Sequence, residues 1–274
     1  MDILSEIGKS RLYTLHSHTQ FCDGRAPMEE MARAAVAEGF DLYGFSPHSP
    51  IPIDSPCNMS AGSVADYLSE VRRIRGLLGP VCSFFAGMEI DYLGPEWGPA
   101  NDYFRRLPLD FRIGSVHFIP SQEGVPTDID GHFDSFSRKM TEIFHGDIRY
   151  VVDTFFSHSL DMIEAGGFDI IGHFDKIGHN ASLYAPGIED EPFYRARISD
   201  MVDAIAASGL IVELNTKAFR EHGRMFPSVR PLREIVRRGV PVIVNSDAHR
   251  PDAVNAGRLQ GFAILDRLME ECRP

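Results

Sequence analysis

The chain has 274 residues, of which 43% are hydrophobic, and a formal net charge of -12 at pH 7. This composition is typical of a globular protein with a sizeable core, and the acidic balance argues against a nucleic-acid partner because phosphate backbones attract basic surfaces. The four cysteines show neither CxxC spacing nor a disulfide pattern, and no signal peptide or membrane-spanning stretch is apparent. We therefore expect a cytoplasmic protein without a membrane or nucleic-acid partner.

Seven short apolar runs are predicted to be β-strands. They are nearly continuous rather than alternating, as expected for parallel strands that are covered on both faces. The runs span Leu12–Ser17, Leu42–Pro47, Val81–Ile90, Phe111–Phe118, Phe168–Gly172, Leu210–Asn215 and Pro241–Ser246.

Helical patterns lie between these runs. Pro27 suits the first turn of a helix that extends to Glu38, and Ser63 with Asp66 resembles a capping box at the start of a helix over Ser63–Leu78. Five helical patterns close on a glycine directly before the next strand, and glycine accepts the left-handed conformation at a helix end. These glycines are Gly39, Gly79, Gly167, Gly209 and Gly239.

The alternation of strands and helices predicts an α/β fold with a parallel sheet. An open, doubly wound sheet would also hold seven strands. A closed barrel explains better why both the first and the last strand end on ligand-type residues, because closure makes these strands neighbours. We expect a single-domain barrel over residues 1–274 with its site at the C-terminal strand ends. Loops at Ser49–Gly62, Leu93–Asn101 and Pro120–Asp134 are expected to shape specificity there.

Six of the strand ends carry histidine or acidic residues. His16 and His18 lie two residues apart, so both side chains project from one face, and the same holds for Asp247 and His249. A lone histidine is more often a buried core residue, but convergence of six such ends indicates a multi-metal site. The candidate ligands are His16, His18, Asp23, His48, Glu89, His117, His173, Asp247 and His249.

The donor types predict the kind of metal. Imidazoles and carboxylates suit Zn, Mn or Fe, and no cysteine takes part in the pattern. Nine candidates exceed the needs of one four-coordinate ion, so we expect two or three divalent transition metals. Glu89 and Asp247 are the expected bridging ligands, because a carboxylate offers two oxygens. Asp23 is the least specific candidate, since Cys22-Asp23-Gly24 is also an ordinary turn.

Basic residues follow two of the strands. Lys176 comes after the strand that ends at His173, and Arg220 after the strand that ends at Asn215. We expect Lys176 and Arg220 to bind a substrate phosphate, as a point charge and as a bidentate fork respectively. Lys217 is a weaker candidate, and solvated loop charges are the alternative for all three.

These motifs resemble the polymerase-and-histidinol-phosphatase (PHP) superfamily, and within it most closely the monofunctional histidinol-phosphatase branch. The resemblance runs from about Tyr13 to Gly257 and implies a distorted (β/α)7 TIM-like barrel with a trinuclear metal centre. It rests on HSH at 16–18, SPHSP at 46–50, GMEIDY at 87–92, IGSVHFI at 113–119, IIGHFDK at 170–176, ELNT at 213–216 and NSDAHRP at 245–251.

The resemblance also implies how the ligands divide. It assigns one cation to His16, His18, Glu89 and Asp247, a second to Glu89, His117 and His173, and a third to Asp23, His48 and His249. One departure is Pro47, which stands where the superfamily commonly has Asp. This change implies that His48 lacks a supporting partner and that the neighbouring metal binds more weakly.

Residues and resemblance together predict a metal-dependent phosphomonoester hydrolase, specifically a histidinol-phosphatase of histidine biosynthesis that converts L-histidinol phosphate and water to L-histidinol and phosphate. A metal-activated hydroxide is expected to attack phosphorus in line. His249 or Asp23 is expected to protonate the leaving oxygen, and Asp247 is the third expected catalytic group.

Two alternatives stay open at this stage. The first is a PHP enzyme that acts on another small phosphomonoester or on a phosphodiester. The second is a non-catalytic metal-binding module, which the intact ligand set disfavours. The sequences of the loops that would contact the leaving group do not identify it, although Asp128 or Asp130 would suit a cationic substrate.

Overall fold

The computed structural model describes residues 3–8 and 10–273. All seven predicted strand positions are present and parallel, although each strand is shorter than predicted. The strands are β1 (Tyr13–Thr14), β2 (Leu42–Phe45), β3 (Ser83–Ala86), which continues as β4 (Glu89–Asp91), β5 (Ile113–Ser115), β8 (Ile170–Ile171), β9 (Ile211–Asn215) and β10 (Val242–Asn245).

The strands form two arcs that join into a ring. One arc has the order β1-β2-β3 and the other the order β10-β9-β8-β5-β4. A parallel bridge between His48 and Glu89 joins the arcs where β2 passes β4. At the other junction Ser17 bridges Ala248, and the N–H of His18 donates to the Ala248 carbonyl over 2.8 Å. The fold is therefore a distorted (β/α)7 TIM-like barrel, as predicted.

The junction between β1 and β10, here called the seam, is where the barrel is most distorted. Within the described residues no strand ladder joins β1 to β10, and side chains take its place. The Asn245 side-chain oxygen accepts the Leu15 N–H over 2.8 Å, and the Thr14 hydroxyl accepts the Ser246 N–H over 3.2 Å. Buried backbone donors thus find partners without a regular ladder.

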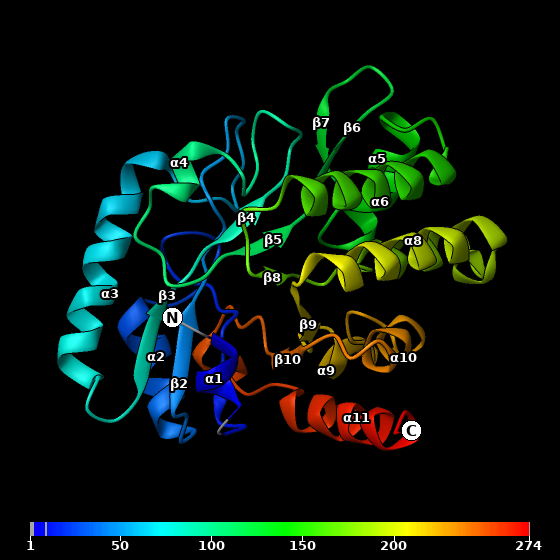
Figure 1. The fold of residues 1–274 in the computed structure, drawn as a ribbon. Helices are drawn as coiled ribbons and strands as arrows, with labels where there is room; N and C mark the ends of the chain where they lie inside the picture. The colour runs from blue at the N-terminus through cyan, green and yellow to red at the C-terminus, as the bar shows by residue number, and fades with distance from the viewer. Residues whose placement is uncertain (1–2, 9, 274) are drawn as a thin grey trace.

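Helices surround this ring (Figure 1), with α2 and α3 on one flank and α6, α8, α10 and α11 on the opposite one. Tyr67, Val71 and Ile74 form the buried stripe of α3, at the spacing expected for an amphipathic helix. The helices are α1 (Ile3–Ile7), α2 (Met28–Ala37), α3 (Val64–Leu78), α4 (Asp102–Arg105), α5 (Phe133–Glu142), α6 (Ile148–Ala165), α7 (Ile177–Tyr184), α8 (Pro192–Ser208), α9 (Phe219–His222), α10 (Val229–Arg237) and α11 (Arg258–Glu271).

Two details at helix ends differ from the prediction. Ser63 makes no side-chain cap, because the 3-10 turn Ala61–Ser63 leads directly into α3 and the Ser60 hydroxyl accepts the Ser63 N–H instead. Gly79 adopts a right-handed φ of -55° and ends α3 without the left-handed turn. The other predicted glycine ends have positive φ, among them Gly39 and Gly209 at +75°.

The segment Pro120–Asp134 is only partly a loop. Its residues Pro126–Asp128 form β7, which pairs antiparallel with β6 (Phe118–Pro120), so the predicted strand Phe111–Phe118 is divided between β5 and this hairpin. The N–H of Ile129 donates to the His117 carbonyl over 2.9 Å. The hairpin is thereby attached to the strand end that carries His117.

Phe111 is fully buried in the core of the barrel, where it packs with residues such as Leu15 and Ile113. Its ring lies directly against Gly44 and Gly87, where a Cβ atom on either residue would collide with it. Glycine at these two positions therefore makes room for the Phe111 ring. The ring packs against both segments and holds their positions.

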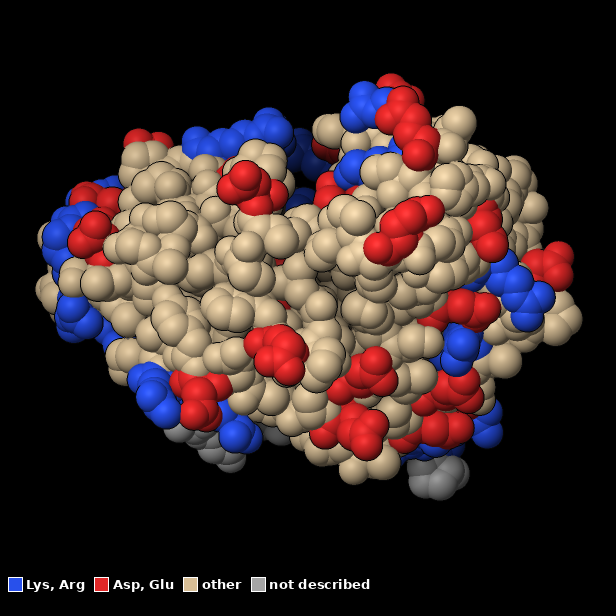
Figure 2. Space-filling view, turned by 90° about the horizontal axis from the view of Figure 1, so that it is seen from above, with Lys and Arg blue, Asp and Glu red and all other residues tan. Residues whose placement is uncertain are grey.

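Charge is distributed without a dominant basic area on the face seen in Figure 2, where acidic and basic side chains are interspersed. None of the described helices has the length and apolar character that crossing a membrane requires.

Candidate metal centre

The structure brings all nine predicted ligands together at the C-terminal ends of the strands. Glu89 lies at their centre and is 1% exposed. Its Oε2 atom is 3.2 Å from His16 Nε2, 3.5 Å from His18 Nε2 and 3.1 Å from His48 Nδ1. Its Oε1 atom is 3.0 Å from His173 Nε2 and 3.5 Å from His117 Nε2. One carboxylate therefore faces five imidazoles, the geometry of a bridging ligand.

Asp247 and Asp23 occupy the other side of the cluster. Asp247 Oδ1 is 3.2 Å from His18 Nε2 and 3.5 Å from His249 Nδ1. Asp23 Oδ2 is 3.3 Å from His249 Nε2, and its Oδ1 is 3.9 Å from His48 Nε2. The positive φ of Asp247, 49°, turns its side chain away from the strand direction and into the cluster.

Three overlapping groups have ligand atoms within 4.8 Å of one another. They are His18, Asp23, His48 and His249; His16, His18 and Asp247; and His48, Glu89 and His117. These groups overlap the three sets implied by the family resemblance without being identical to them. His18 and His48 each take part in two groups, and His173 approaches the cluster through Glu89.

The ligand atoms lack the partners that buried polar atoms normally have. Six atoms of the cluster are shielded from solvent and have no hydrogen-bond partner among the described residues: His16 Nε2, His18 Nε2, Asp23 Oδ1, His48 Nδ1, His117 Nε2 and Asp247 Oδ1. Buried polar groups without a partner are rare and costly. Here they converge, with imidazole and carboxylate donors, so the residues fit bound transition-metal cations.

Glu213, which was not among the predicted site residues, supports this cluster from behind. Its Oε1 atom is 2.6 Å from His16 Nδ1 and accepts the side-chain amide of Asn245 over 2.9 Å. Its Oε2 atom accepts the N–H of His173 over 3.1 Å. The carboxylate sets the orientation of His16, whose Nε2 atom faces Glu89 and Asp247, as outer carboxylates do in metal sites.

Asp91 orients His117 in the same way, and it was also not among the predicted site residues. Its Oδ1 is 2.6 Å from His117 Nδ1, and its Oδ2 accepts the Asn58 side-chain amide over 2.7 Å. Asp91 lies two residues after Glu89, on the same face of the strand. The spacing that identified His16 with His18 would therefore have identified Asp91.

Electrostatics divide the histidines into two classes. Burial, with the neighbouring His249 and His48, holds the pKa of His18 well below its usual range, and burial also lowers the pKa of His48 and His173. Burial opposes protonation of His117 too, but Asp91 and Glu89 outweigh it and raise the pKa of His117 to about 9.

His16 belongs to the second class, because Glu213, Asp247 and Glu89 outweigh burial and raise its pKa well above the usual range. The surroundings therefore favour the protonated form of His16 and His117, which outer carboxylates support, and the neutral, cation-binding form of His18, His48 and His173.

The three basic side chains differ in how closely they approach the ligands. Lys217, predicted as the weaker phosphate ligand, lies closest to the ligands: its Nζ is 3.2 Å from His249 Nε2 and 3.5 Å from Asp247 Oδ1. Lys176 Nζ pairs with Asp130 Oδ2 at 2.5 Å. Arg220 is exposed on α9 and makes no hydrogen bond or ion pair with any described residue. Phosphate binding by Lys176 and Arg220 stays a prediction.

The chain is similar to proteins of known family. Residues 14–217 match the PHP domain family. A probable histidinol-phosphatase of Schizosaccharomyces pombe is 26% identical, over 92% of this chain and 85% of the relative. A probable histidinol-phosphatase of Deinococcus radiodurans is also 26% identical, over 93% of this chain and 90% of the relative.

Two solved structures share the fold. One is a putative histidinol phosphatase from Listeria monocytogenes, with a TM-score of 0.78 and 19% identity over 90% of this chain and 99% of that chain. The other is histidinol phosphate phosphatase from Lactococcus lactis subsp. lactis in complex with Zn, L-histidinol and phosphate, with a TM-score of 0.70 and 16% identity over 95% of this chain and 93% of that chain.

Proposed function

Because this chain belongs to the PHP domain family, we propose that it is a metal-dependent phosphatase that hydrolyses L-histidinol phosphate to L-histidinol and phosphate. The observation that carries the proposal is the set of six unpartnered, buried ligand atoms around Glu89. The names of the two relatives support the choice of substrate, as does the complex of the Lactococcus lactis protein with L-histidinol and phosphate.

Two or three divalent cations, held by the nine residues around Glu89 and Asp247, would supply Lewis-acid charge and lower the pKa of water towards neutrality. The chain itself fixes the geometry. Glu213 and Asp91 hold His16 and His117 in orientation from behind. Ser115 donates to Glu89 Oε1 over 2.7 Å, and Asn215 donates to Asp247 Oδ2 over 3.0 Å, so both central carboxylates are fixed before substrate arrives.

Cationic side chains around this set would neutralise the phosphoryl group. Lys217 lies against Asp247 and His249, and Lys176 lies on the hairpin side, next to Asp130. Arg220, exposed on α9, would have to turn inwards to join them. A phosphate in contact with both lysines would gain charge-assisted hydrogen bonds from each of them.

His249 is the residue we assign to protonation of the leaving oxygen, with Asp23 as its partner, a role that requires its Nε2 atom to carry a proton and not to coordinate a cation. Its Nε2 atom lies 3.3 Å from Asp23 Oδ2 and 3.2 Å from Lys217 Nζ. The side chain is 15% exposed, so it lies at the rim of the cluster where a departing alcohol would leave. General acids of this kind contribute about 10²- to 10⁴-fold to a rate.

The decisive measurement is a rate comparison of L-histidinol phosphate with a panel of phosphomonoesters and phosphodiesters on the metal-loaded protein. We expect L-histidinol phosphate to have the highest kcat/KM. A phosphodiester or another monoester as the preferred substrate would replace the proposed leaving group, and no turnover of any phosphoester would refute phosphatase function.

A matched pair of variants tests the site. His16→Ala should lose metal and rate, because it removes a ligand that is 0% exposed. His145→Ala is the control, because that histidine is 63% exposed and contacts Glu123 on the hairpin side. Equal metal content and rate in both variants would show that the site lies elsewhere.

A cytoplasmic location is also part of the proposal. Its support is that all four cysteines are free thiols, as is usual in a reducing compartment.

A further inference from the structure

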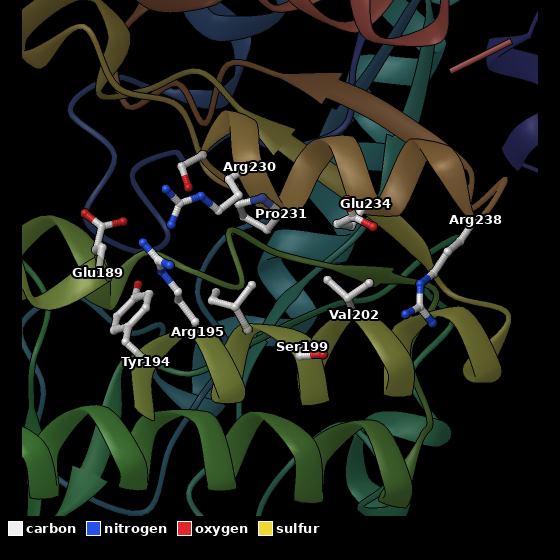
Figure 3. A pocket seen from close by; sticks show the side chains of 11 residues that line it. Glu189, Tyr194, Arg195, Ser199, Val202, Arg230, Pro231, Glu234 and Arg238 are labelled. Atoms are coloured by element: carbon white, nitrogen blue, oxygen red, sulfur yellow. The ribbon is translucent and has the colours of Figure 1, made fainter. Parts of the chain in front are cut away.

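A cavity lies between α8 and α10, and none of the nine metal ligands lines it. Its volume is 660 Å³, which lies within the range of roughly 300 to 1,000 Å³ common for small-molecule sites. Figure 3 shows Arg195 and Arg230 at one end of the cavity and Arg238 at the other. The cavity is therefore large enough for a metabolite and separate from the metal centre.

The end with Arg195 and Arg230 carries excess positive charge. Both guanidinium groups reach the same oxygen, Asp190 Oδ1, over 2.7 Å and 3.2 Å. Two further acids line the cavity. Glu189 is already engaged by both terminal nitrogens of Arg224 at 2.8 Å and 2.9 Å, and Glu234 pairs with Arg237 at 3.2 Å. Two cations thus share one exposed carboxylate, and an exposed pair of this kind costs little to rearrange.

The walls of the cavity are suited to an apolar body. Ile198, Val202 and Pro231 line them. Tyr194, which is 2% exposed, also lines the cavity, and its hydroxyl has no hydrogen-bond partner among the described residues. A ligand with a hydrogen-bonding group beside an apolar part would satisfy this hydroxyl. Concave, mostly apolar sites with a few polar groups are typical of small-molecule binding.

The cavity is linked to the metal centre by one hydrogen bond. Ser228 lines the cavity, and its N–H donates to Asp175 Oδ2 over 2.7 Å. Asp175 is fully buried and lies two residues after His173, the ligand that approaches Glu89. Displacement of Ser228 by a ligand would therefore shift the segment that positions His173.

We propose that the cavity between α8 and α10 is an effector site for a small organic anion, a carboxylate or phosphate with an apolar body. Arg195 and Arg230 bind the anionic group, Ile198, Val202 and Pro231 contact the apolar part, and occupancy alters cation binding through Ser228 and Asp175. The site is independent of the substrate proposed above, because none of its lining residues belongs to the ligand set.

Calorimetry on the metal-loaded protein tests binding with two probes of matched size, phenylacetate and benzylamine. We expect saturable binding of one phenylacetate and none of benzylamine. The double variant Arg195→Ala/Arg230→Ala should weaken phenylacetate binding by about tenfold or more. Val202→Trp should abolish it by filling the cavity, and circular dichroism checks that both variants are folded.

Three results would overturn the binding proposal: no saturable binding of phenylacetate, unchanged affinity in the double arginine variant, or loss of binding in His16→Ala. The last result would place the probe at the metal centre instead. None of these measurements depends on hydrolysis, so they stay interpretable if the protein proves not to be a phosphatase.

The link to the metal centre has its own test. Zn²⁺ affinity, measured with and without saturating phenylacetate, is expected to change by about fivefold or more in the wild-type protein. The Val202→Trp variant should show no change, which controls for chelation of Zn²⁺ by the probe. Equal Zn²⁺ affinities in the wild-type protein would refute the coupling.

Discussion

The metal centre and the cavity between α8 and α10 both bring together charged side chains from several elements. They differ in how deeply these side chains are buried and in whether their polar atoms have hydrogen-bond partners. At the metal centre the side chains are buried, His16 at 0% and Asp247 at 3% exposure, and their inner atoms lack partners. In the cavity Arg195 and Arg230 are 54% and 63% exposed and already paired with Asp190. Buried ligand atoms without a hydrogen-bond partner fit a bound cation, whereas exposed, paired charge permits exchange of a ligand.

Glu89→Gln should have the largest effect, because it removes one carboxylate oxygen from a residue that faces five imidazoles. We expect hydrolysis to fall by more than about 100-fold and metal content to drop, since even outer supporting residues cost 10- to 100-fold. Rate assays and elemental analysis would measure both effects. A variant with full metal content would show that Glu89 is not the bridging ligand.

Removal of the metals should destabilise the fold. A cation held at 100 times its dissociation constant contributes about 2.7 kcal/mol, which corresponds to a drop in Tm of roughly 5–10 °C for a chain of this size. Calorimetry with and without a chelator measures this, and re-addition of Zn²⁺ is the control. An unchanged Tm would mean that the unpartnered atoms at the centre hold no tightly bound cation.

Glu213→Gln should have a smaller effect than Glu89→Gln, because Glu213 acts on the cations through His16 and the His173 backbone. We expect metal affinity to fall by about 10- to 100-fold while excess Zn²⁺ restores most of the rate. Titration of Zn²⁺ against activity separates the two parameters. Failure of excess Zn²⁺ to restore the rate would assign Glu213 a direct role in the reaction.

Metal affinity should rise with pH between 7 and about 9. The pKa of His117 is raised to about 9, so at pH 7 a cation must displace its proton. Affinity should therefore increase by about tenfold per pH unit for each proton displaced and then level off. Calorimetry in buffers of different ionisation enthalpy counts the protons. Flat affinity over this range would show that His117 is neutral in the metal-free protein.

The metal-free fold should show the opposite trend. A protonated His117 stabilises it below the ordinary pKa of 6.5, and this contribution is lost as pH rises through about 9. Chemical denaturation of the chelated protein across this range measures the loss.

Arg238→Ala, at the far end of the cavity, should have the smallest effect. Arg238 pairs with Asp203 at 2.5 Å, but the two side chains are 40% and 58% exposed. We expect the free energy of unfolding to change by less than about 0.5 kcal/mol, with no change in metal content. Urea denaturation would measure the free energy of unfolding. A decrease above about 2 kcal/mol would show that the exposed pair of Arg238 and Asp203 contributes substantially to stability.

Much of the site was predictable from the chain alone, because in parallel α/β folds the C-terminal strand ends converge. That rule brought together His16, Glu89 and His249, which are far apart in sequence. The roles of Glu213 and Lys217 were not predictable in the same way, since they depend on which side chains face each other across neighbouring strands. The division of Phe111–Phe118 into two strands was missed because hairpin pairing overrides a continuous apolar run. The single-domain organisation stays a prediction.

The seam makes the cation site depend on closure of the barrel. Asn245 closes the ring by accepting the Leu15 N–H, and through its amide it also holds Glu213 behind His16. The first and last strands must therefore meet before the ligands are in place. A chain in which β10 has not reached β1 lacks Asp247 and His249, two of the nine ligands, and the amide that holds Glu213. The complete ligand set therefore exists only in the closed ring, so binding of cations and closure of the barrel are thermodynamically linked.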